Sequence, residues 1–62
     1  MPSNLHSAEV NQAAGMVLVQ AGISIDGAFD LMEITAEATG ETLDEVAARI
    51  LSGDLRFEDR FD

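Results

Sequence analysis

Three glycines divide most of this chain into segments of helical length. Gly22, Gly40 and Gly53 each follow a run of good helix formers. The position just after a helix favours glycine, because the backbone there often adopts a positive φ. The spacing predicts three helices, over about residues 7–21, 25–38 and 43–52. We therefore expect an all-α fold, a small three-helix bundle.

The bundle is expected to occupy residues 8–53 of the 62-residue chain. Residues 1–7 would form an N-terminal segment, and residues 54–62 an acidic tail that docks partly on the bundle. Leu55 and Phe57 are the apolar side chains expected to hold the tail, since both lie near the end of the third helix.

Each predicted helix begins at a residue that can cap it. Ser7 and Ser24 are expected to accept hydrogen bonds from the first turns of the first two helices. Thr42 and Glu45 have the spacing of a capping box at the start of the third. Within the helices, apolar residues recur every three or four positions, as on the buried face of an amphipathic helix. The predicted inward-facing residues are Val10, Ala13, Ala14, Val17, Leu18, Ala21, Ala28, Leu31, Met32, Thr35, Ala36, Leu43, Val46, Ala47, Ile50 and Leu51.

The small size of the chain makes association with another subunit a reasonable expectation. At about 1.5 kcal/mol of conformational entropy per ordered residue, roughly 90 kcal/mol opposes folding. The chain has no cysteine, so no disulfide offsets that cost. Met16 and Val19 lie off the inward stripe of the first helix and are a possible dimer seam. Gly15, inside the same helix, is expected to permit the close approach of another helix.

The charge of the chain argues against unaided binding to phosphate. Twelve acids face three arginines, for a formal net charge of −9, and all of the acids except Glu9 follow residue 21. Nucleic acids and anionic membranes are bound largely through Lys and Arg. The longest apolar stretch, residues 13–19, is far shorter than a membrane span. We expect a cytoplasmic protein that makes no contact with a membrane.

The sequence does not indicate an enzyme or a metal protein. A hydrolytic or transfer site needs a nucleophile with a base. His6 is the only histidine, it lies near the N-terminus, and the chain has no cysteine. The neighbouring acids do not follow the alternating pattern of a calcium loop, so a solvated helix surface explains them better. The glycines do not form a phosphate-binding loop. We expect no catalytic residue, no metal site and no cofactor.

Several short motifs occur in an order that resembles the ANTAR domain. They are Asn-Gln-Ala-Ala-Gly-Met at residues 11–16, Gly-Ile-Ser at 22–24, Ala-Phe-Asp-Leu at 28–31 and Leu-Asp-Glu-Val-Ala at 43–47. The resemblance covers about residues 10–57. Its start and its closing Leu-Arg-Phe look most like the actinobacterial branch, in which the domain often follows a GAF sensor. The residues that match the family core are Ala13, Gly15, Met16, Ala28, Phe29, Leu31, Ala36, Leu43, Val46 and Ala47.

The resemblance implies a three-helix module that binds paired hairpins in nascent RNA and prevents transcription termination. Such modules usually act as dimers, fused to a receiver or a ligand-sensing domain. The family's second helix usually carries arginines and an aromatic residue, and here those places hold Glu33, Ile34, Thr35 and Glu37. The candidate RNA contacts are therefore the three arginines of the chain, Arg49, Arg56 and Arg60.

Two functional hypotheses follow. The first is an RNA-binding antitermination module that is signal-controlled and works as a dimer or beside a basic partner domain. The second is a degenerate ANTAR fold that no longer binds RNA and acts as a dimerisation or protein–protein interaction module. The expected partners are hairpin RNA and either a second copy of the chain or a regulatory protein. The motifs favour the first hypothesis, whereas the charge favours the second.

Overall fold

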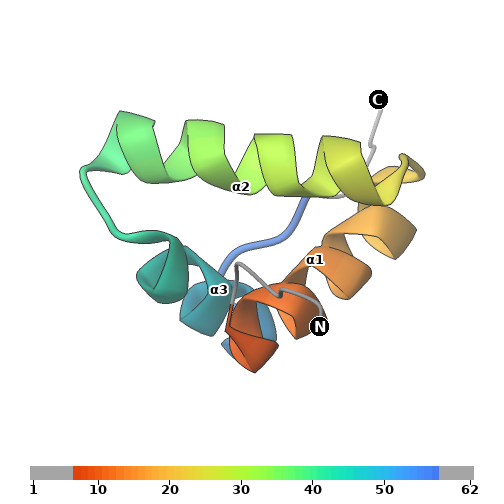
Figure 1. Ribbon diagram of the computed structural model, residues 1–62. Coiled ribbons are helices and arrows are strands. Elements are labelled where there is room, and N and C mark those ends of the chain that lie inside the picture. The colour runs from red at the N-terminus through yellow and green to blue at the C-terminus, as the bar shows by residue number, and fades with distance from the viewer. Residues whose placement is uncertain (1–6, 58–62) are drawn as a thin grey trace, which may run out of the picture.

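A computed structural model describes residues 7–57 of the chain (Figure 1). Three helices follow one another in the order α1 (Ala8–Ala21), α2 (Ile25–Thr39) and α3 (Leu43–Ser52). The described residues contain no strand. The predicted all-α three-helix bundle is confirmed, and the helix boundaries agree with the predicted ones to within one residue.

The three N-caps are made by hydroxyl side chains. Ser7, Ser24 and Thr42 each have an extended backbone, and each accepts a hydrogen bond of 3.1 Å from the N–H three residues further on. At α3 the capping box is complete, because the Glu45 carboxylate also accepts from the Thr42 N–H at 2.8 Å. These contacts satisfy donors that have no partner within the helix.

Glycine ends all three helices in a left-handed conformation. Gly22, Gly40 and Gly53 have φ values of 68°, 76° and 87°. The N–H of each cap bonds back to a carbonyl of the last helical turn. A side chain would be strained at such a φ, so glycine sets where the chain turns. The first of these turns is sharp, since α1 and α2 are bent by 105° relative to each other.

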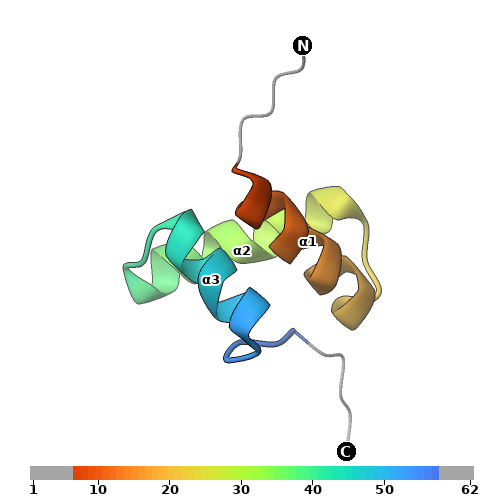
Figure 2. The same cartoon turned by 90° about the horizontal axis from the view of Figure 1, so that it is seen from below.

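The helices form two layers. Figure 1 shows that α2 forms one layer and that α1 and α3 form the other, both lying on the same side of α2. Figure 2 shows α1 and α3 side by side and running in the same general direction. Two long-range hydrogen bonds fix that direction. The Ser7 hydroxyl donates to Asp44 Oδ1 at 2.9 Å where both helices begin, and the Phe57 N–H donates to Gln20 Oε1 at 3.0 Å near their other ends.

All three helices contribute to one apolar core. Its fully buried residues are Val10, Ala13, Ala14, Val17, Ala28, Met32, Val46, Ala47 and Ile50. A ring of half-buried side chains packs against them, comprising Met16, Leu18, Ile23, Phe29, Leu31, Ala36, Leu43, Leu51, Leu55 and Phe57. Leu55 and Phe57 come from the segment after α3, so this segment lies against the bundle.

Gly15 differs from expectation. It lies in the second half of α1, and no atom of the other described elements comes within 4 Å of the position that a Cβ atom would take. The prediction that Gly15 admits a neighbouring helix is therefore wrong for contacts within residues 7–57. The reason is its place on the helix. The four buried residues of α1 lie on one side, at positions 10, 13, 14 and 17, and residue 15 faces away from them.

Within residues 7–57, no single helix combines the length and the apolar content needed to cross a membrane. The pair α1 and α2 meets that test together only as a bent unit.

Candidate nucleic-acid interface

The arginines are the only basic side chains that could meet a phosphate, and the described ones gather at one end of the molecule. Arg49 lies in the last turn of α3, and Arg56 lies in the segment that follows. Arg60 falls outside the described residues, as does His6. The end of α3 and the segment behind it therefore form the candidate interface.

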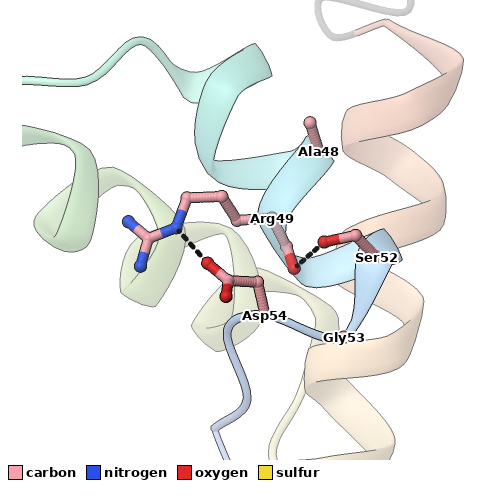
Figure 3. Close-up of a pocket in the computed structure, with 5 residues that line it drawn as sticks. All are labelled: Ala48, Arg49, Ser52, Gly53 and Asp54. Carbon is pink, nitrogen blue, oxygen red and sulfur yellow. Dashed lines mark hydrogen bonds and ion pairs between the residues drawn. The ribbon is translucent and has the colours of Figure 1, made fainter.

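Arg49 is held between two carboxylates. Its Nη1 lies 2.8 Å from Glu41 Oε1, and its Nε lies 3.2 Å from Asp54 Oδ2. Figure 3 shows the guanidinium and the Asp54 carboxylate pointing toward each other. Glu41 belongs to the connection between α2 and α3, and Asp54 follows α3 directly. Arg49 thus joins three consecutive parts of the chain, and its side chain remains 37% exposed.

This pairing changes what Arg49 offers to an anion. The hydrogen bond to Glu41, followed by that to Asp54, raises the pKa of Arg49 above its usual value, so the guanidinium stays charged. The three groups together, one guanidinium and two carboxylates, nevertheless carry a formal charge of −1. A phosphate that approaches Arg49 must compete with the carboxylates that already bond to Nη1 and Nε. While both ion pairs are present, Arg49 offers no net positive charge to attract an anion.

An open hollow lies beside Arg49, lined by Ala48, Arg49, Ser52, Gly53 and Asp54 (Figure 3). Its polar groups are already bonded to the helix. The Ser52 hydroxyl donates to the Arg49 carbonyl at 3.0 Å. The N–H groups of residues 53–55 donate to the carbonyls of Arg49 and Ile50 at 2.9 to 3.1 Å. These hydrogen bonds cap the end of α3, so the donors are not available to a ligand in the hollow.

The described chain is acidic as a whole. Residues 7–57 carry nine acids and two arginines. Among these residues, no group of three or more His, Asp or Glu side chains is placed to hold a metal ion. Eight of the nine carboxylates lie within residues 26–54, so the main effect of this part of the surface is to repel polyanions.

The candidate dimer seam lies on a different surface. Val19 is 76% exposed, whereas Met16 is half-buried and packs against the core. The two residues of the predicted seam therefore differ in exposure, although they lie one helical turn apart on α1. Sequence reasoning also missed Glu41 and Asp54 as partners of Arg49. They lie eight positions before it and five after it, and neither spacing is a recognised ion-pair signal within a helix.

Comparison with known proteins identifies the fold. The family model of the ANTAR domain matches residues 5–51, which is most of the chain. Neither the curated proteins nor the solved structures give a match. The family match spans all three helices except the last residue of α3. The chain therefore belongs to the ANTAR domain family, a family of RNA-binding regulatory modules in transcription antitermination.

Proposed function

We propose that this chain regulates transcription antitermination in the cytoplasm by binding hairpin RNA as a signal-controlled dimer. The observation that carries this proposal is the family match over residues 5–51. The ANTAR family is regulatory and not enzymatic. The proposed RNA contacts are Arg49, Arg56 and Arg60.

RNA binding requires a change at Arg49. The guanidinium presents its donors in a planar fork that fits a phosphate as well as a carboxylate. A hairpin phosphate would replace Asp54, whose side chain is the more exposed of the two partners at 69% against 25% for Glu41. We therefore expect Asp54 to be displaced first, while Glu41 continues to orient the guanidinium.

A binding titration with a two-hairpin RNA tests this function. We expect saturable binding at low salt that weakens steeply as salt is added. Each phosphate contact contributes about −0.7 to −0.9 to the slope of log K against log salt concentration, so three arginines in each of two subunits predict about −5 at the steepest. Asp54→Asn should strengthen binding, because it leaves Arg49 with one carboxylate partner. Arg56→Gln should weaken binding and make the slope shallower by about 1.4 to 1.8, because the dimer loses two phosphate contacts.

Glu9→Gln is the matched control for Asp54→Asn. It removes the same charge, but Glu9 lies in the first turn of α1, at the opposite end of the bundle from Asp54. If both variants strengthen binding equally, the effect is one of net charge and the proposed role of Arg49 is wrong. Absence of binding even at low salt would contradict RNA recognition by this chain.

The proposed dimer uses the outer side of α1. Among its 14 residues, Glu9 is the only charged one. The positions facing away from the core are Ala8, Gln12, Gly15 and Val19, spaced by four, three and four residues. Two such faces can meet without opposing carboxylates, and Gly15 leaves room for the backbones to approach. Two copies that associate through this side of α1 therefore bring no carboxylates together.

Changing Met16 and Val19 together to glutamate should convert a dimer into a monomer, because it places one charge per subunit in the outward face, at Val19, and a second at its edge, at Met16. Mass determination in solution measures the result. Val19→Glu alone serves as a second variant, since Met16 also packs on the core. Ile25→Glu, at a site on α2 that is 42% exposed, is the control. An unchanged mass in both seam variants removes this seam from the proposal.

The second candidate function is a degenerate ANTAR fold that acts as a protein–protein interaction or dimerisation module without RNA. The observation that favours it is the double pairing of Arg49, which leaves little uncompensated positive charge at the candidate interface. The same titration separates the two functions. A stable dimer that fails to bind the two-hairpin RNA at low salt would support the second.

A further inference from the structure

The outer side of α2 carries an acidic stripe that the core does not use. Beside it runs an apolar stripe that the core uses only in part, through Leu31. The acidic stripe consists of Asp26, Asp30, Glu33 and Glu37. The apolar stripe, one residue further along, consists of Gly27, Leu31, Ile34 and Ala38. In both stripes the spacing is four, three and four residues, which keeps the members on one side of a helix. Each stripe is about 16 Å long, or three helical turns.

The acidic stripe is exposed to solvent along its whole length, and the apolar stripe is exposed in part. All four acids of the acidic stripe are exposed. In the apolar stripe, Ile34 is 61% exposed and Ala38 is exposed, whereas Leu31 is half-buried. In the apolar stripe, Ile34 and Ala38 are therefore the residues that the rest of the bundle leaves uncovered.

The acidic stripe has no cationic partner within residues 7–57. The ion pairs of Arg49 join it to Glu41 and Asp54 and include none of the four acids. The helix itself contains no basic residue. Four like charges along three turns repel one another, and an adjacent opposite charge would relieve that repulsion.

The acidic and apolar stripes together indicate which kind of partner would bind. An exposed isoleucine beside half-buried Leu31 favours contact with another apolar surface. The flanking carboxylates favour cations at the edge of that contact, where charge pairs set partner choice and register. An amphipathic helix with one apolar stripe and Lys or Arg beside it meets both requirements. A second copy of the chain does not, because it would bring its own four acids against these four.

We propose that the acidic and apolar stripes of α2 form a docking surface for a basic amphipathic helix of another protein. RNA is excluded from this surface by the same carboxylates. The proposal does not depend on RNA binding by the arginine-bearing end of α3, since the two surfaces share no residue. It also leaves the outer side of α1 free for self-association.

The test uses a synthetic helical peptide of about 18 residues, five turns long. Leucine occupies its core positions, lysine flanks them, and alanine fills the rest. A peptide of the same composition in scrambled order is the control, because it keeps the charge and removes the apolar stripe. Calorimetric titration should show binding of the ordered peptide that weakens with salt. Backbone amide shifts in the spectrum of the labelled protein should change along α2.

Matched variants separate the two stripes. Glu33→Gln should weaken binding about two- to fivefold, whereas Glu9→Gln, which removes the same charge from α1, should leave it unchanged. Ile34→Gln should weaken binding about fivefold, whereas Ile25→Gln on the same helix should have no effect. Ile25 is 42% exposed and lies off both stripes.

Three results would overturn the proposal. The first is equal binding of the ordered and scrambled peptides, which would mean attraction by net charge alone. The second is equal weakening by Glu33→Gln and Glu9→Gln. The third is absence of binding of the ordered peptide at low salt. None of these results bears on the RNA titration, so failure here and failure of the proposed function are distinguishable.

Discussion

Replacing Ile50 with alanine is expected to lower the free energy of unfolding by about 2–5 kcal/mol. Ile50 is fully buried and is among the largest buried side chains of the core. Its loss removes apolar contacts from the one core to which all three helices contribute and leaves a cavity that short helices cannot easily close. Since domains of this size have only a few kcal/mol of stability, we expect most of the variant to be unfolded at room temperature. Denaturant titration followed by helical circular dichroism measures the change.

Ile34→Ala is the matched control. It makes the same chemical change in another helix, but Ile34 is 61% exposed. We expect the free energy of unfolding to change by less than about 0.5 kcal/mol, because surface substitutions rarely do more and alanine is the better helix former. Equal losses in the two variants would contradict the buried position of Ile50.

Enlarging Ala47 to leucine is the second substitution with a large expected effect. Ala47 is fully buried in the same cluster as Ala13 and Ala14 of α1, and the contact between α1 and α3 is the most extensive between any two of the helices. Three extra carbon atoms at such a site force the helices apart or the side chain off its preferred rotamer. We expect a loss of about 1–3 kcal/mol in the free energy of unfolding.

Ala48→Leu provides the comparison for this prediction. Residue 48 is adjacent in α3 but exposed, so leucine there gains a solvated side chain and displaces nothing. We expect little change in stability, measured by thermal and denaturant unfolding of the two variants side by side. If Ala47→Leu proved as stable as Ala48→Leu, the close packing of α1 on α3 would be wrong.

Local signals predicted the helices because their physical causes are local. A hydroxyl caps an N–H three residues away, and a glycine ends a helix through its own backbone conformation. Ser24, Thr42 and Gly40 act in these ways in the structure, as the sequence alone indicated. The same applies to the buried face of α3, where Val46, Ala47 and Ile50 are spaced for one side of a helix.

The candidate site was less predictable. The sequence pointed to Arg49 because arginine is the only cation that the chain has, and composition is enough for that inference. It did not show that Glu41 and Asp54 enclose the guanidinium. Their positions depend on how the chain turns at Gly40 and Gly53, and the direction of those turns is a property of the folded bundle.

The sequence by itself determined the helices, their ends, the family and the surplus of acid, because each follows from residue type and spacing. Only the tertiary structure decided which ends of the helices meet and which sides stay uncovered. Ser7 bonds to Asp44 and Phe57 to Gln20 across 37 positions in each case, and Gly15 faces away from every other described element. The physical reason is that burial selects one side of each helix, but the relative placement of the buried sides depends on all three helices packing together.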